Sequence, residues 1–106
     1  MSHHKFAKQI HERDNYTCVY CNLDGKLSYI NYRMLTLDHL KPKAYEENNS
    51  IENLITACFI CNQFKGHFYP EYAKTQKDVF NEIRKHIKTQ LSFDFKKYIS
   101  DVKKFI

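Results

Sequence analysis

Apolar side chains recur with a helical period at both ends of this chain. Apolar residues four positions apart near the N-terminus predict a short helix over residues 4–13. Beyond Pro70, apolar positions form two successive stripes: Val79, Phe80, Ile83, Ile87 and Leu91, and then Phe95, Tyr98, Ile99, Val102, Phe105 and Ile106. Between the stripes, Ser92 or Asp94 is suited to cap a second helix. We therefore expect a helical hairpin over residues 71–106 that covers the core.

The middle of the chain predicts strands, a loop and a further helix. Residues 27–32 and 34–40 are expected to be extended, with Leu35, Leu37 and His39 alternating against Thr36, Asp38 and Leu40, and the two segments can form a hairpin. The polar stretch at 42–50 begins with a proline and predicts a loop. Residues 51–58 supply another extended segment, and a helix should begin at or just after Phe59.

The length and composition fit one small α+β domain. A chain of 106 residues buries only a thin core, so a structural metal would contribute much of its folding free energy. We expect one domain over residues 1–106, with a core at 13–70 and a helical extension at 71–106. No apolar run approaches the roughly 18 residues of a membrane span, and the N-terminus lacks the apolar segment of a signal peptide. These features predict a cytoplasmic protein without membrane contact.

The positive charge is concentrated in the C-terminal third. The formal net charge is +5, and residues 71–106 hold 9 Lys and Arg against 5 Asp and Glu. A polyanion such as DNA would be attracted to this end through phosphate neutralisation. A solvated, lysine-rich helix face explains the same charge equally well.

The four cysteines form two CxxC pairs, Cys18 with Cys21 and Cys58 with Cys61. This spacing is typical of a tetrahedral zinc site with four thiolate ligands. The 36 residues between the pairs exceed the roughly 15–20 of a plain zinc ribbon, so the insert should carry the function. Two disulfides are the alternative, but the absence of a signal segment favours structural Zn²⁺.

The insert and the helix after it contain the groups that phosphodiester hydrolysis requires. His39 can act as a general base because the ordinary pKa of histidine is about 6.5. Asp38 and Asn62 offer the oxygen ligands that Mg²⁺ prefers. Asn53 is placed to bond the loop backbone and support the histidine segment. Lys65 lies one helical turn past Asn62 and can approach a phosphate.

A strand raises one geometric difficulty for this site. Neighbouring residues on a strand point to opposite faces, so Asp38 and His39 can share a site only if the strand ends or bends there. Pro42, just beyond them, is consistent with such an ending.

Four stretches of the sequence, CVYC, LDHLKP, NSIENLITAC and CFICNQFKG, closely resemble the HNH endonucleases, in particular the zinc-containing group with four cysteines. The resemblance covers residues 13–66. It implies a ββα-metal core in which Asp38 binds the catalytic cation, His39 is the general base, Asn53 is a brace and Asn62 is the second metal ligand. The family name reflects a histidine at this last position, and the asparagine here favours Mg²⁺ or Mn²⁺ over softer metals.

The leading hypothesis is a metal-dependent endonuclease that acts on double-stranded DNA, with Zn²⁺ as structural ion and Mg²⁺ or Mn²⁺ as catalytic ion. One such site cuts one strand, so double-strand cleavage would require two turnovers or a homodimer. A non-catalytic zinc-ribbon module that binds nucleic acid is the main alternative. A nuclease directed at RNA is a third reading, because the same chemistry acts on either backbone.

Overall fold

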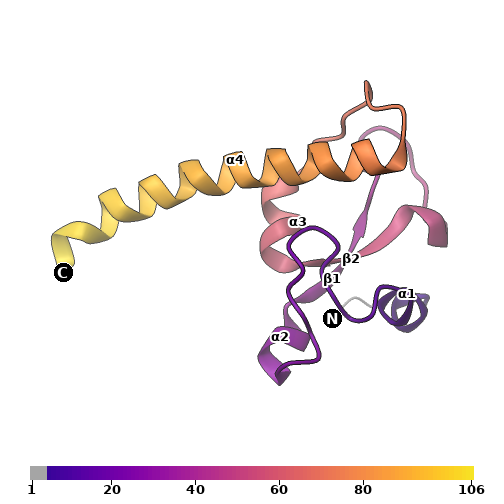
Figure 1. Cartoon of the computed structure of the whole chain (residues 1–106), viewed down its shortest axis with the longest axis horizontal. Helices are drawn as coiled ribbons and strands as arrows, with labels where there is room; N and C mark the ends of the chain where they lie inside the picture. The colour runs from indigo at the N-terminus through magenta and orange to yellow at the C-terminus, as the bar shows by residue number, and fades with distance from the viewer. Residues whose placement is uncertain (1–4) are drawn as a thin grey trace.

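The computed structural model describes residues 5–106, and its elements surround one small sheet (Figure 1). In chain order they are α1 (Ala7–Arg13), α2 (Tyr29–Arg33), β1 (Leu35–His39), the 3₁₀ turn η1 (Ile51–Asn53), β2 (Leu54–Cys58), α3 (Phe59–Lys65), α4 (Gln76–Val102) and the 3₁₀ turn η2 (Lys103–Phe105). The α+β class is confirmed, and within the described residues the sheet has two strands, β1 and β2. The predicted start of the first helix, His4, lies outside the described residues.

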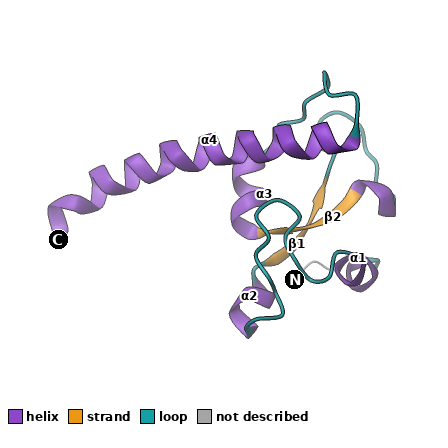
Figure 2. Ribbon diagram, viewed as in Figure 1, coloured by secondary structure: helices purple, strands orange, loops and turns teal. Residues whose placement is uncertain are grey.

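The two strands pair antiparallel, with Leu35 opposite Cys58 and His39 opposite Leu54. α3 contacts both strands and also α4, so it lies between the sheet and the long helix (Figure 2). α1 contacts β2. Every residue of β2 is buried, which is the pattern of a strand covered on both faces. This compact ββα unit holds the residues that the sequence singled out.

The apolar core forms where α4 crosses α3 and the first cysteine pair. Its buried members are Cys18, Tyr20, Leu40, Ile55, Ala57, Cys58, Cys61, Val79, Ile83 and Ile87. Arg84 on α4 also donates a hydrogen bond to the carbonyl of Val19, at 2.8 Å, and this bond fastens the long helix to the first cysteine turn. The first half of α4 is therefore part of the domain body.

The predicted helical hairpin over residues 71–106 is wrong. α4 is one continuous helix that begins after Thr75, whose side chain accepts a hydrogen bond from the backbone of Asp78. No glycine or proline interrupts residues 76–102, so nothing forces a turn at Ser92 or Asp94. The second half of the helix runs out beyond the body instead of covering it (Figure 1). Despite its length, α4 is not apolar enough to cross a membrane, and neither is any other helix within residues 5–106.

The predicted extended segment at 27–32 is also wrong. Residues 29–33 form α2, and Ser28 caps it by accepting a hydrogen bond from Asn31 at 3.0 Å. β1 pairs with β2, a strand from across the 42–50 loop, and not with residues 27–32. The predicted strands at 34–40 and 51–58, the loop between them and the helix beginning at Phe59 are confirmed within the usual variation of element ends.

His11 anchors α1 to the sheet. Its side chain is fully buried, and its Nδ1 atom lies 2.7 Å from the hydroxyl of Thr56 on β2. Asp14 accepts a hydrogen bond from the backbone of the same threonine at 2.8 Å. Burial lowers the pKa of His11, and the nearby Asp14 carboxylate opposes this shift. The structure therefore holds this imidazole in its neutral form.

We predict that His11 makes the protein less stable in mild acid. As the pH falls below about 6.5, the unfolded chain binds a proton at this histidine that the buried ring does not accept. The free energy of unfolding should then decrease with a slope of up to about 1.4 kcal/mol per pH unit, until the pH reaches the lowered pKa of the folded state. Urea titrations between pH 7.5 and about pH 5 measure this slope.

A His11→Gln variant is the matched control, because it keeps every other titrating group, including the four cysteines. Its stability should depend less steeply on pH over the same range. Parallel curves for the parent and the variant would assign the acid sensitivity to other groups.

Candidate functional site

The four cysteines converge on one point. Their sulfur atoms all lie within 4.8 Å of one another, all four thiols are free, and the sulfurs of Cys21 and Cys58 are 3.7 Å apart. A tetrahedral Zn²⁺ with bonds of about 2.3 Å places its sulfur ligands about 3.8 Å apart. The cluster therefore fits one zinc ion, as the two CxxC pairs predicted.

Local backbone structure brings each pair of sulfurs together. Cys18 begins a tight turn in which its carbonyl accepts a hydrogen bond from Asn22 at 2.9 Å. Asn22 has a positive φ of 66°, a conformation that asparagine tolerates better than most residues. Cys58 ends β2 and caps α3, with its sulfur accepting a hydrogen bond from the backbone of Cys61 at 3.4 Å. The second pair is thus built into the junction between strand and helix.

The crowded sulfurs share protons. Hydrogen bonds from Cys58 and Cys61 lower the pKa of Cys18 to about 2. The bond to Cys18 in turn raises the pKa of Cys58 to about 12, and the pKa of Cys61 is raised for the same reason. A dication at the centre would replace these protons, since metal binding requires deprotonated thiols.

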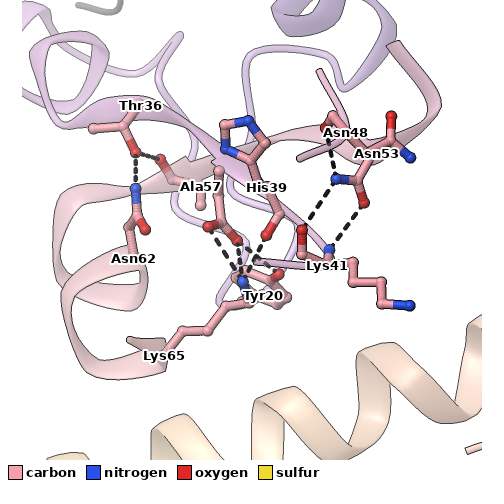
Figure 3. Close-up of polar contacts among 10 residues, drawn as sticks. Tyr20, Thr36, His39, Lys41, Asn48, Asn53, Ala57, Asn62 and Lys65 are labelled. Atoms are coloured by element: carbon pink, nitrogen blue, oxygen red, sulfur yellow. Dashed lines mark hydrogen bonds and ion pairs between the residues drawn. The ribbon is translucent and has the colours of Figure 1, made fainter. Parts of the chain in front are cut away.

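A buried ion pair joins β1 to α3 (Figure 3). The ammonium group of Lys65 is 3.0 Å from Oδ2 of Asp38, and their side chains are 1% and 7% exposed. The hydroxyl of Tyr20 donates a hydrogen bond to the same carboxylate at 3.0 Å. Burial raises the pKa of Asp38 and lowers that of Lys65, and each group partly offsets the shift of the other. The carboxylate is therefore held by a resident cation and a phenol.

The structure corrects the expected position of Lys65. Its Nζ also donates a hydrogen bond to the carbonyl of His39 at 2.8 Å, so it binds the end of β1 and does not face solvent, where a phosphate would approach. Tyr20 was missed by the sequence reasoning. The sequence did contain a signal for it. Tyr20 lies between Cys18 and Cys21, and a shared metal site requires these cysteines to lie against Cys58 and Cys61, at the start of α3. Burial and the Asp38 carboxylate raise the pKa of Tyr20 well above 10, so it remains a donor.

His39 lies at the end of β1 with its ring directed away from the Lys65 ammonium group (Figure 3). The ring is half-buried, and its Nε2 is 2.7 Å from Oδ1 of Asn49 in the loop. Asp38 is turned toward α3, as the alternation of a strand requires. The strand does end at His39, but the carboxylate and the imidazole do not meet in this arrangement.

Asn62 on α3 faces Thr36 on β1. Its Nδ2 donates a hydrogen bond to the threonine hydroxyl at 3.1 Å, and that hydroxyl donates to the carbonyl of Ala57 at 2.8 Å. Within residues 5–106, no donor is bonded to Oδ1 of Asn62, which leaves this oxygen available to a ligand. Thr36 and Asp38 are two residues apart on the strand and share its α3 face, so Asn62 and Asp38 border the same region.

Asn53 closes the loop that follows His39 (Figure 3). Its Oδ1 accepts a hydrogen bond from the backbone of Lys41 at 2.9 Å. Its Nδ2 donates to the carbonyls of Lys41 and Asn48, at 3.1 and 2.9 Å. The side chain is buried, so these bonds replace water for backbone groups on both sides of the loop.

A four-cysteine metal cluster joined to a ββα unit defines the class of domain. Residues 18–68 match the family model described as HNH endonuclease, so this segment is similar to the HNH endonucleases. The chain is also 37% identical over 57 residues to the CRISPR-associated endonuclease Cas9 of Corynebacterium diphtheriae. That match covers 53% of this chain and 5% of the relative. No solved structure matches the chain at a significant level.

We predict that removing the metal unfolds the protein. The core is thin, and the cluster joins the first cysteine turn to the strand-helix junction, so its loss removes the link between them. Elemental analysis should find one zinc per chain, and a strong chelator should abolish the cooperative thermal transition seen by circular dichroism. Adding Zn²⁺ back should restore it. A chelated protein with an unchanged Tm, or cysteines oxidised to each other, would contradict the assignment.

A second prediction concerns the buried ion pair. Lys65→Met should destabilise the protein by about 3–5 kcal/mol, because it leaves the Asp38 carboxylate buried without a counter-charge. Lys85→Met is the matched control: Lys85 is paired with Glu82 at 3.4 Å but is 77% exposed, so its loss should change stability by less than about 0.5 kcal/mol.

Chemical denaturation of both variants measures the difference. Adding Asp38→Asn to Lys65→Met should recover part of the loss, since the uncompensated charge is then gone. Equal stabilities for the two lysine variants would show that the ion pair does not hold β1 against α3.

Proposed function

We propose that this protein is a metal-dependent endonuclease that hydrolyses phosphodiester bonds of double-stranded DNA. The observation that carries the proposal is the junction of β1 and α3, where Asp38 and Asn62 border one region and His39 stands at the adjoining end of the strand, inside the segment that matches the HNH endonuclease family model. The excess of lysine and arginine in residues 71–106 supports a polyanionic substrate.

His39 is the proposed general base. Oδ1 of Asn49 can only accept a hydrogen bond, so the Nε2 atom of His39 donates to it and carries the proton. The lone pair is then on Nδ1, which is the atom that would take a proton from the attacking water. Asn49 fixes the tautomer and the ring orientation, and Asn53 holds the loop from which Asn49 acts.

Asp38 and Asn62 are the residues that would hold a catalytic Mg²⁺ or Mn²⁺. Both offer hard oxygen atoms, and the Asp38 carboxylate already stabilises a positive charge, the ammonium group of Lys65. Such a cation, when bound, neutralises charge on the phosphate and makes the attacking water more acidic. To bind this cation, Asp38 would have to share or give up its contact with Lys65. We therefore expect the cation to bind weakly in the absence of DNA.

One observation favours the alternative of a non-catalytic zinc-ribbon module that binds nucleic acid. Both oxygens of Asp38 are engaged by Lys65 and Tyr20, and the residue is only 6% exposed. DNA binding without strand scission under any divalent metal would support this alternative. Cleavage confined to RNA would instead show that RNA, and not DNA, is the substrate.

We predict that His39→Ala reduces the cleavage rate by roughly 10²–10⁴-fold, the usual contribution of a general base. The measurement is a plasmid assay with Mg²⁺ or Mn²⁺ that resolves supercoiled, open-circle and linear forms. His67→Ala is the control, because His67 is exposed and lies outside the contacts described above. Zinc content and Tm should be unchanged in both variants. If His39→Ala cuts DNA as fast as the parent, another group is the base.

A further inference from the structure

The four members of the cysteine cluster differ in how well the fold protects them. Cys18, Cys58 and Cys61 are only 0–2% exposed, whereas Cys21 is an exposed residue. A surface cavity of about 310 Å³ is lined by Cys21 and Cys61 together with side chains of α4. Since a water molecule occupies about 30 Å³ in the liquid, this cavity admits a small molecule to the cluster. The cluster therefore has one side that a dissolved reagent can reach.

Exposure decides which sulfur reacts first. Ligands of a structural Zn²⁺ are all thiolates, so the four sulfurs do not differ in protonation once the site is filled. Oxidation of a cysteine requires thiolate character and access for the oxidant. Cys21 has both, and the other three sulfurs are buried. Cys21 is therefore the position at which an oxidant would attack.

A second sulfur lies within reach of Cys21. The sulfur atoms of Cys21 and Cys58 are 3.7 Å apart. A disulfide bond is about 2.05 Å long, so the two atoms need to approach by only about 1.7 Å. Cys58 belongs to the other CxxC pair and caps α3 at the end of β2. A bond between these two sulfurs would thus take one ligand from each pair.

We propose that the cysteine cluster is a redox switch in which a hydroperoxide oxidises Cys21 and Cys58 to a disulfide. With hydrogen peroxide, the Cys21 thiolate attacks one oxygen, a sulfur–oxygen bond forms, the oxygen–oxygen bond breaks and hydroxide leaves. The Cys58 thiolate then attacks the sulfur of this sulfenic acid and expels a second hydroxide. Two thiolates lose two electrons to one peroxide, and with two protons the products are one disulfide and two water molecules.

The disulfide removes half of the ligands of the metal site. Cys18 and Cys61 are left, and two sulfurs do not complete the four-ligand shell of a structural Zn²⁺. Tyr20 lies between Cys18 and Cys21 and donates to the Asp38 carboxylate, so the change at the first cysteine turn also reaches the candidate site. The proposal rests on zinc at the cluster and not on nuclease activity, because zinc release and thiol loss are measured directly.

Hydrogen peroxide added to the zinc-loaded, full-length chain tests the proposal. A chromogenic zinc indicator should record the release of one zinc per chain, with the loss of two thiols counted by alkylation and mass spectrometry. Peptide mapping should find the first disulfide between Cys21 and Cys58, and a reductant with added Zn²⁺ should reverse both changes. Failure of the chain to bind zinc, retention of zinc under peroxide that oxidises glutathione, or a first disulfide between other cysteines would overturn the proposal.

Replacing single ligands tests which sulfur reacts first. Cys21→His keeps four ligands, since zinc sites with three cysteines and one histidine are common, and it should slow zinc release at least about tenfold. Cys61→His is the matched control: it replaces a ligand that is 2% exposed and leaves Cys21 in place, so zinc release should stay within about twofold of the parent. Equal rates in the two variants would overturn the assignment of Cys21. If either variant fails to bind zinc, the disulfide mapped in the parent decides.

Discussion

The convergence of four sulfur atoms is the constraint on which the rest of the molecule depends. It joins a turn near the N-terminus to a strand-helix junction about forty positions later in the chain, and the whole insert is closed between these two points. Because Cys58 is both the last residue of β2 and the cap of α3, fixing its sulfur also fixes the direction of the helix relative to the strand. Tyr20, between the cysteines of the first pair, is carried with them to the Asp38 carboxylate. The cysteine cluster therefore also fixes the position of residues in the candidate site.

The buried ion pair gives the site a preformed charge environment at some cost. Removing a carboxylate and an ammonium group from water is unfavourable, and the attraction between them repays it only with good hydrogen bonding. Here Lys65 bonds both the Asp38 carboxylate and the carbonyl of His39, so it holds both residues of the predicted Asp-His pair at the end of β1. Lys65, which the sequence analysis expected near a phosphate, is instead buried between β1 and α3. In the proposed nuclease, a cation at Asp38 would compete with the Lys65 ammonium group, so its binding would be favoured when a substrate phosphate supplies further ligands.

The sequence predicted what depends on local spacing and missed what depends on packing. The cysteine pairs, the two strands, the loop between them and α3 were all predictable, because turn residues and ligand spacing specify them. α2 was missed because Tyr29, Ile30 and Tyr32 are residue types that favour strands, whereas the cap at Ser28 favours a helix. The continuous α4 was missed because two apolar stripes were read as two helices. They are successive segments along the chain, the first buried against the body and the second exposed and continuing past the end of α4 at Val102. The burial of Lys65 has no sequence signal, because it follows from how α3 lies against β1.

The alternation of β1 finally constrains how a nuclease of this geometry would work. Asp38 faces α3 and His39 faces away from it, so a base and a cation at these residues would act from two sides of one strand end. The two faces meet only where the strand stops, at the boundary between β1 and the loop that Asn53 closes. The proposed base, His39, is therefore positioned by the loop, through its contact with Asn49 and the bonds of Asn53. The proposed cation ligands are positioned by the cysteine cluster. The loop and the cysteine cluster would thus support opposite halves of the same site.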